Sequence, residues 1–507
     1  MIITIALLTS CVKLLLLPAY RSTDFEVHRN WLALTHSLPY KKWYFEDTSE
    51  WTLDYPPLFA WFEYFLSFFA KFFDDKMLVV SNLNYASDKT VLFQRLSVII
   101  SDIFYIYGVY KVSKSLKKSW RNDVVLPIIL ITNCGLIMLD HVHFQYNGMM
   151  YGILLLSIAY LYQGQYLKAA CVFTILLNMK HIYIYVAPAY FIYLLKHYCL
   201  QSNLTITNTF SIKFMKNTSI LATTVLAVFF LSFAPFADHI DKVLSRLFPF
   251  KRGLCHAYWA PNFWALYNIV DKIGYYICKK MGIIEFLKPT ASMTGGLVQE
   301  FSHSFLPNVT PFITILVTAT FMLPVMGKLL LQDKHPINFL RCMTLCGLTA
   351  FLFGWHVHEK AILMAIIPLS ILSVMEARDA NIFLILSVVG HYSLFPLLYP
   401  DSLLLIKVLL LILHSMYSFH SLSKIYPLNI CKYSLPLLNH IESMYILGLV
   451  LIFLYENVIH YVLGISKILP FLPLMITSVY CSLGVIYCWI KMYINFFQKC
   501  NRNVRNK

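Results

Sequence analysis

Long apolar runs separated by short polar segments dominate this chain of 507 residues. Because a helix needs about 20 apolar residues to cross the hydrocarbon core of a bilayer, each run predicts a membrane-spanning helix. The candidate spans lie at approximately 2–19, 92–112, 124–139, 148–162, 167–179, 183–198, 218–235, 261–278, 306–326, 339–355, 361–375, 381–398, 402–419, 441–461 and 470–494. Some are short, and neighbours such as 167–179 and 183–198 can form one broken helix, so we expect about 11 to 14 crossings.

Charges in the connecting segments predict the side of the membrane that each loop occupies. The loop 111–121 contains five basic residues, so the positive-inside rule places it in the cytosol. The segment 20–90 is then the first lumenal loop, and 236–260 is the second. The stretch 260–306 can hold one span or a re-entrant segment, and side assignments after it stay open. No linker or internal repeat is visible, which predicts a single integral membrane domain over 1–507.

The segment 20–90 is too apolar for a plain loop and too polar for a span. Residues 61–73 place aromatic side chains on most faces of a helix, with Glu63 and Lys71 among them. This pattern is typical of a helix that lies in the membrane interface. The tryptophans of the segment fit the aromatic belt of a membrane protein, and they are Trp31, Trp43, Trp51 and Trp61.

The composition supports a membrane protein and excludes several other classes. Hydrophobic residues make up 59% of the chain and charged residues 13%, whereas soluble domains contain about 25% charged residues. The net charge of +16 lies mostly in short loops rather than in one patch, which argues against a nucleic-acid-binding protein. The 12 cysteines are scattered without a CxxC pair, so no disulfide scaffold or structural zinc is indicated. We therefore predict an all-α polytopic membrane protein.

Two acidic clusters occur in the first lumenal loop. In STDFEVHRNW, Thr23 or Asp24 can cap a helix, with Glu26 completing a capping box. The functional alternative is that Asp24 acts as a general base at the membrane surface, with His28 one helical turn away. In SEWTLDYPP, the paired prolines impose an extended turn that holds Asp54 beside the membrane, although the same residues also suit a plain turn before a helix.

A third cluster, DHVHFQYN at 140–147, follows a predicted span. If this stretch is extended, Asp140, His141 and His143 can face one way and serve as metal ligands. A third firm ligand is lacking, so we do not expect a metal there.

Two further clusters carry positive charge. Adjacent Lys251 and Arg252 suit a phosphate group, but basic residues beside lipid headgroups also serve as anchors, and both readings stay open. In HVHEK, His356, His358 and Lys360 alternate with other residues at the end of a span. This motif lacks the i, i+4 histidine pair of a zinc helix, so we expect polar and phosphate contacts instead.

Acidic, histidine and basic groups around an interfacial aromatic segment suit two classes of protein. One class is an enzyme with a lipid-phosphate substrate, in which a carboxylate deprotonates an acceptor and cations stabilise the departing phosphate. The other is an ion-coupled transporter. The ionisable residues lie in loops and at span ends rather than at the midplane, and no inverted repeat is visible, which favours the enzyme.

At these clusters the sequence resembles the endoplasmic reticulum glucosyltransferases that use dolichyl-phosphate glucose. STDFEVHRNW, SEWTLDYPPLFAWFEY, DHVHFQYNG, RLFPFKRG and HVHEK match in order over nearly the whole chain, and this order is specific although each motif alone is weak. Two related enzymes share the pattern and add the first and the second glucose to the lipid-linked oligosaccharide. STDFEVHRNWLA, and LCHAYWAPNFWALYN after KRG, are more similar to the second. The first usually has a GLFEDKVANFW-like stretch there, from which this chain departs.

The resemblance implies a GT-C type glycosyltransferase fold with lumenal interfacial helices. The implied reaction transfers glucose from β-linked dolichyl-phosphate glucose to Glc1Man9GlcNAc2 on dolichyl diphosphate, with inversion to an α-1,3 linkage. This is the second glucose of the precursor for protein N-glycosylation, and it implies a multi-pass protein of the endoplasmic reticulum membrane with a lumenal active site. The alternatives are the first glucosyl transfer, onto Man9GlcNAc2 on dolichyl diphosphate, and a transporter or flippase of lipid-linked sugars.

Carried over by motif position, Asp24 is the catalytic base that takes the proton of the acceptor hydroxyl. Asp54 is a second acid that orients the acceptor, and His141 is a further substrate contact. The expected phosphate contacts are Lys251, Arg252, His356, His358 and Lys360. The implied partners are the two dolichol-linked substrates and membrane lipid, without nucleic acid. We expect no cofactor and no metal, because no DxD-type pair serves a nucleotide sugar and the leaving group has one phosphate.

Overall fold

A computed structural model of the chain describes residues 1–116, 119–200, 211–248, 253–256, 258–282, 302–332, 335–427 and 433–498. In these residues the structure consists of helices and the irregular segments that connect them, with one isolated parallel bridge between Cys255 and Val357. Contacts divide the chain into two compact units, Met1–Pro249 with Leu397–Leu410, and Phe250–Pro396 with Leu411–Lys507. The single-domain organisation stays a prediction, and each unit is described by itself.

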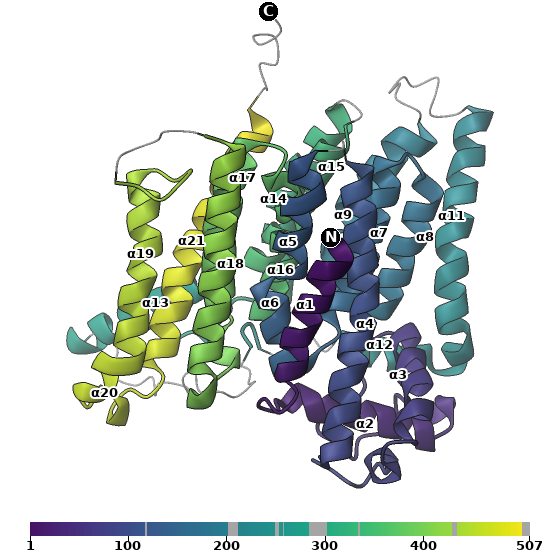
Figure 1. Ribbon diagram of the computed structural model, residues 1–507, viewed down its shortest axis with the longest axis horizontal. Coiled ribbons are helices and arrows are strands. Elements are labelled where there is room, and N and C mark those ends of the chain that lie inside the picture. Colours follow the sequence, from purple (N-terminus) through teal and green to yellow (C-terminus); the bar gives the residue numbers. More distant parts are fainter. Residues whose placement is uncertain are drawn as a thin grey trace, which may run out of the picture. The chain divides into compact units, whose positions relative to one another are not determined.

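The first unit contains a group of long helices that pack side by side. Its α-helices are α1 (Ile2–Leu15), α2 (Thr23–Ser37), α3 (Pro57–Ala70), α4 (Asp88–Ser115), α5 (Leu126–Ile131), α6 (Cys134–Leu136), α7 (Asn147–Tyr162), α8 (Tyr166–Met179), α9 (Ala187–Leu194), α11 (Ile212–Phe233) and α12 (Ile240–Leu247). Helix α4 packs on α7, α7 on α8 and α8 on α11 (Figure 1). Glycine allows the closest of these approaches, because a Cβ atom on Gly108 of α4 would meet the carbonyl oxygen of Gly152 of α7.

The second unit is also built from packed helices. They are α13 (Phe263–Lys280), α14 (Pro311–Leu331), α15 (Pro336–Phe353), α16 (Leu363–Ser373), α17 (Ala377–Tyr392), α19 (His440–Leu454), α20 (His460–Val462) and α21 (Leu472–Phe497). Helices α14, α15, α16 and α17 pack in chain order, and α21 packs against α13, α15 and α17. Helix α18 (Leu404–Ile425) begins in the residues of the first unit and ends in those of the second.

The helices confirm the all-α polytopic membrane class. Among the described residues, nine helices are long and apolar enough to cross a membrane, and four shorter apolar helices accompany them. The run 183–198 folds as a segmented helix, which consists of the 3-10 segment His181–Tyr185, α9 and the π-helical segment Leu195–Cys199. Short continuous helices such as α7 and α8, together with this segmentation, explain why fewer helices are long enough to span than the number of apolar runs predicts.

The predicted interfacial helices gather at one end of the first unit. Helices α2, α3 and α12 lie at the same end of α4, α7, α8 and α11 (Figure 1). The side chain of Phe236, just before α12, packs against Tyr40, Trp43 and Trp61 of the earlier segment. Residues 111–115 of the predicted basic loop belong to the last turns of α4 rather than to a loop, and this end of the helix is opposite to the end where α2 and α3 lie (Figure 1). Segments 20–90 and 236–248 therefore share one side, as their predicted topology requires.

Helix α3 shows why the segment 20–90 reads as neither a loop nor a span. Its inward face buries Glu63 completely, and the Oε1 atom of that carboxylate lies 2.7 Å from Nδ1 of His28. The opposite face, with the turn that follows, exposes Phe65, Phe68, Phe69 and Phe72. Exposed phenylalanines on a short helix suit contact with the membrane interface.

Candidate active site

Asp24 lies in the first turn of α2, with 24% of its side chain exposed. Ser22, rather than Thr23 or Asp24, occupies the N-cap position, but its hydroxyl accepts no hydrogen bond from the helix and instead donates to the carbonyl oxygen of His143. Glu26 pairs with Arg29 at 2.7 Å. The predicted capping box is therefore wrong, and Asp24 has no capping role.

Two side chains from the third motif contact Asp24. The Nε2 atom of Gln145 donates to Oδ2 of Asp24 at 2.7 Å, and Nε2 of His143 lies 3.2 Å from the same oxygen. Motifs more than 100 residues apart in the sequence thus meet at one carboxylate. A carboxylate that accepts hydrogen bonds from fixed donors is held in one orientation, as proton transfer requires.

The third motif is helical rather than extended, which corrects the prediction for 140–147. Residues Ile137–Phe144 form a π-helical segment that ends where Phe144 takes a positive φ of 92° and Gln145 becomes extended. The guanidinium group of Arg95 donates to the carbonyl oxygens of His141 and Val142 at 2.7 and 3.0 Å. This break gives the side chains different directions, and the three candidate metal ligands do not converge.

The carboxylate of Asp140 accepts hydrogen bonds from the first residues of the next helix, α7. Its Oδ2 atom accepts a hydrogen bond from the backbone N–H of Gly148, and its Oδ1 atom accepts from Nδ2 of Asn147 at 2.9 Å. A carboxylate at a helix N-terminus satisfies backbone donors and is favoured by the helix dipole. Gly148 has no room for a side chain, because a Cβ atom would lie 2.5 Å from Oδ1 of Asp102 and 3.3 Å from Oδ2 of Asp140.

His141 faces a buried ion cluster behind this turn. Its Nε2 atom lies 3.0 Å from Oδ2 of Asp102, and the same oxygen accepts from Nζ of Lys13 at 2.6 Å. All three side chains are buried. Charged groups at such depth persist only when paired. The structure thus gives His141 a structural partner, and its role as a substrate contact stays a prediction.

Lys180 is a cation of this site that sequence reasoning missed. It follows the last residue of α8, and its Nζ atom donates to Oδ1 of Asn147 at 2.9 Å. The ammonium group also lies 5.1 Å from the centroid of the Tyr55 ring. The sequence offers one indication of it, a lysine between two apolar runs, but such a lysine often only anchors the chain at the lipid headgroups.

Asp54 is half-buried in the extended turn before Pro56 and Pro57. Burial raises the pKa of the neighbouring Tyr55 hydroxyl well above its usual value, and the charges of Asp54 and Asp24 raise it further. The Tyr44 hydroxyl donates to the carbonyl oxygen of Tyr55 at 2.7 Å. Tyr55 therefore stays protonated among carboxylates, and the second motif faces the same site as the first.

The HVHEK motif forms a separate group in the second unit. The backbone N–H of His356 donates to the carbonyl oxygen of Leu254 at 3.0 Å, next to the bridge between Cys255 and Val357. The ring of His256 lies 4.1 Å from that of His358 and 5.4 Å from that of His356, measured between centroids. Burial lowers the pKa of His256 well below its usual value, and His358, His356 and Lys360 lower it further, whereas the Glu359 carboxylate acts in the opposite direction.

His256 was not among the predicted contacts, although the residues LCHAYW around it were part of the family resemblance. Only the pairing of its segment with the HVHEK segment reveals its position. Lys251 and Arg252 lie outside the described residues, so their expected phosphate contacts stay predictions.

One set of side chains in the second unit could hold a metal ion. The ligand atoms of His256, His358 and Glu359 all lie within 4.8 Å of one another. Two imidazoles and a carboxylate are a donor set that suits zinc. Nδ1 of His358 lies 2.9 Å from Oε2 of Glu359, and the same Nδ1 atom accepts from the backbone N–H of Lys360.

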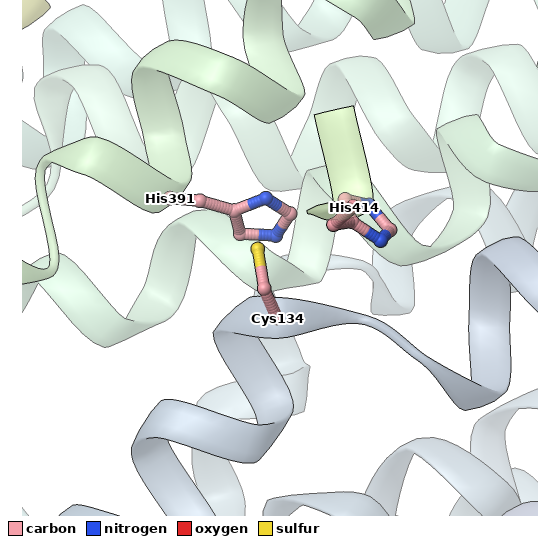
Figure 2. A group of neighbouring side chains, drawn as sticks. All are labelled: Cys134, His391 and His414. Atoms are coloured by element: carbon pink, nitrogen blue, oxygen red, sulfur yellow. The ribbon is translucent and has the colours of Figure 1, made fainter. Parts of the chain in front are cut away.

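A second pair of imidazoles lies between α17 and α18 in the same unit. The rings of His391 and His414 are 5.2 Å apart at an angle of 79° (Figure 2). Both side chains are buried. Neither belongs to a motif of the family resemblance, and we assign no substrate contact to them.

Comparison with known proteins shows similarity over nearly the whole chain. A family model described as the ALG6, ALG8 glycosyltransferase family matches residues 9–492. A Mus musculus protein named "Dolichyl pyrophosphate Glc1Man9GlcNAc2 alpha-1,3-glucosyltransferase" is 49% identical over 506 residues, which cover 96% of this chain and 94% of the relative. A Bos taurus protein of the same name is 49% identical and covers 97% of this chain and 94% of its own length. For an Arabidopsis thaliana protein of that name, the identity is 44% and both shares are 95%.

Proposed function

The chain belongs to the ALG6, ALG8 glycosyltransferase family, and we propose that it adds the second glucose to the lipid-linked oligosaccharide used in protein N-glycosylation. The acceptor is Glc1Man9GlcNAc2 on dolichyl diphosphate, and the product bond is an α-1,3 linkage. The observation that carries this proposal is the one name shared by relatives of 41–49% identity in animals, a plant and Dictyostelium discoideum.

The donor in this proposal is dolichyl-phosphate glucose, and the transfer proceeds in one displacement with inversion. The acceptor 3-hydroxyl oxygen forms a bond to the anomeric carbon, and the bond from that carbon to the phosphate oxygen breaks. The electron pair leaves with dolichyl phosphate, and the hydroxyl proton passes to Asp24. Support for Asp24 comes from its partial exposure and from its fixed contacts with Gln145 and His143.

The remaining substrate contacts belong to two groups. Asp54 lies beside Tyr55 and orients the acceptor. His141, next to Asp140 in the third motif, is a further substrate contact. His356, His358 and Lys360, with Lys251 and Arg252, contact the phosphate of the donor. Positive and hydrogen-bonding groups stabilise the charge that develops on a departing phosphate. In support of His356, His358 and Lys360, these side chains lie near His256, where the segment of Cys255 pairs with the HVHEK segment.

We also propose that the transfer needs no metal and no cofactor. The leaving group carries a single phosphate, which side-chain cations can neutralise without a divalent ion. Removal of divalent ions by a chelator tests this proposal directly.

The proposed location is the endoplasmic reticulum membrane, with the active site on the lumenal side. The multi-pass architecture is established by the spanning helices. Support for the lumenal side comes from the basic loop 111–121, which lies at the end of α4 opposite to α2 and α3. A cysteine-accessibility map of single variants in these segments would test the sidedness.

The test of the proposed function is a single-turnover assay of the purified protein with labelled dolichyl-phosphate glucose. Two acceptors are offered in parallel, one without glucose and one with a single glucose. We expect extension of the monoglucosylated acceptor only. Extension of the unglucosylated acceptor only would make the chain the enzyme of the first transfer. If folded protein extends neither acceptor and instead moves labelled glycolipid across vesicles, the transferase proposal fails.

A further inference from the structure

A chain of side-chain hydrogen bonds connects Lys180 to Asp24 within the first unit. The Nζ atom of Lys180 donates to Oδ1 of Asn147 at 2.9 Å. Asn147 in turn donates from Nδ2 to Oε1 of Gln145 at 2.8 Å. Gln145 then donates from Nε2 to Oδ2 of Asp24 at 2.7 Å. Two neutral amides thus separate a cation from the proposed catalytic carboxylate.

The cation on one side of Asn147 and the Asp140 carboxylate on the other determine which way both amides point. An ammonium group has donors only, so the atom of Asn147 that faces Lys180 must be its oxygen. The NH2 group of Asn147 then points to the acceptors on its other side, which are Oε1 of Gln145 and Oδ1 of Asp140. Because the oxygen of Gln145 is used in this way, its NH2 group faces Asp24. If both amides were reversed, an amide oxygen would face the carboxylate of Asp24.

The members of this chain are held by the surrounding fold. Asn147 is the first residue of α7 and is buried, while Lys180 follows the end of α8 and is half-buried. The aromatic ring of Tyr55 lies over the ammonium group of Lys180. Shielding from water strengthens each hydrogen bond and makes an incorrectly oriented amide costly.

We propose that Lys180, acting through Asn147 and Gln145, is a positioning residue that keeps an N–H donor on the Asp24 carboxylate and so holds it ready to accept the acceptor's proton. This inference rests on the proposed function of Asp24 as the base. It assigns a role to three residues for which the family resemblance implied none.

Other titratable groups face this chain from every neighbouring segment. His143 lies beside Asp24, Asp140 lies beside Asn147, and Tyr55 lies beside Lys180. Asp54 is next to Tyr55 in the sequence. Behind Asp140 is the ion cluster of Asp102, Lys13 and His141. None of these groups supplies the amide donor that Gln145 supplies.

The experiment measures kcat and KM for the monoglucosylated acceptor from about pH 5.5 to 8, a range that covers the acidic limb of a carboxylate base. The variants are Lys180→Met, Lys180→Arg and Asn147→Asp in the full-length protein. Two matched controls lie away from the site. They are Lys168→Met on the exposed surface of α8, and Asn308→Asp, an exposed position whose side-chain oxygen accepts from the backbone N–H of His303, as a carboxylate oxygen also can. Thermal unfolding of each purified variant verifies that it folds.

In Lys180→Met, we expect kcat at neutral pH to fall about tenfold to a hundredfold with KM little changed, since a misplaced catalytic group slows the chemical step. The acidic limb of the pH profile should move to higher pH, because a weakened donor favours the ionised carboxylate less. Lys180→Arg should retain most of the activity. Asn147→Asp should have a larger effect, because its carboxylate repels Asp140 and turns the Gln145 oxygen toward Asp24. Both controls should match the wild type.

The inference is overturned if Lys180→Met raises KM and leaves the pH profile in place, because Lys180 then contacts substrate directly. An unchanged kcat in that variant also overturns it. If Asn147→Asp does not fold, the two Lys180 variants still decide the outcome. A wild-type protein that transfers no glucose to either acceptor would instead contradict the proposed function, which separates the two failures.

Discussion

The polar groups of the two units are held in different ways. Around Asp24, side chains bond to side chains in one direction, from Lys180 through two amides to the carboxylate. Around HVHEK, the backbone is joined to its neighbouring segment, and the imidazole rings lie against one another. Proton transfer depends on the position of single atoms, whereas phosphate binding depends mainly on local positive charge. The contrast predicts that substitutions in the first group change the rate and substitutions in the second change donor affinity.

The largest effect is expected for Asp24→Asn. Removal of the base should lower kcat by about 10²- to 10⁴-fold, the usual contribution of a general base. The amide has nearly the same size, so insertion into the membrane and thermal unfolding should not change. Single-turnover transfer measures the rate, with Asp401→Asn, an exposed aspartate outside both groups, as the control. Near-normal transfer by Asp24→Asn would remove Asp24 from the role of base.

A second strong effect is expected for Gly148→Ala. The new Cβ atom would lie 2.5 Å from Oδ1 of Asp102 and press on the carboxylate of Asp140, which contacts Asn147. We expect a loss of about 1–3 kcal/mol of stability, as for other overpacked sites, together with lower kcat.

The matched control for this prediction is Gly327→Ala in α14. No atom lies within 4 Å of the corresponding Cβ position, so alanine should be neutral or slightly stabilising there. Thermal unfolding of the two variants measures the difference. Equal stability for both would show that the turn at Gly148 can move aside, and that the geometry around Asp24 is less rigid than the hydrogen bonds indicate.

An intermediate effect is expected for Lys360→Met and His358→Ala. Each removes a group of the proposed phosphate site, so KM for dolichyl-phosphate glucose should rise by about tenfold while kcat changes less. Initial rates at varied donor concentration test this, with Lys279→Met on the exposed end of α13 as the control. A fall in kcat at constant KM would show that these side chains act in the chemical step. It would contradict the proposed difference between the residues around Asp24 and those around HVHEK.

The smallest effect is expected for removal of divalent metal. A chelator should leave the rate and the unfolding temperature unchanged, and metal analysis of the purified protein should find no stoichiometric zinc. The opposite outcome, in which zinc restores a chelated enzyme and His256→Ala abolishes that rescue, would assign the metal to His256, His358 and Glu359. The second group would then act through a bound cation rather than through side-chain charge.

The helical architecture could be predicted well from apolar runs, because a segment without polar side chains has few alternatives to crossing the bilayer. The run 306–326, for example, corresponds to α14 at Pro311–Leu331, and 470–494 corresponds to α21. Prediction failed where a run breaks, as at the π-helical segment before Phe144. Such a break depends on Arg95 from another helix, which no local pattern reports.

The candidate site was partly predictable for a different reason. Asp24 stands out because a carboxylate beside the membrane is costly unless it has a use. Gln145, Asn147 and Lys180 do not stand out, because neutral amides and a lysine near a span end are ordinary in any loop. Their function depends on being next to one another, and their separation in the sequence conceals it.

The sequence by itself determined the class of the protein, the position of its spans and the clusters in which polar residues meet apolar runs. These follow from composition and from the length of a helix that can cross a bilayer. The tertiary structure decided which atoms of these clusters face one another. Three hydrogen bonds illustrate this, and they join Ser22 to His143, Lys180 to Asn147 and Gln145 to Asp24. Each depends on the direction in which the side chains point, and packing between helices sets that direction rather than residue type.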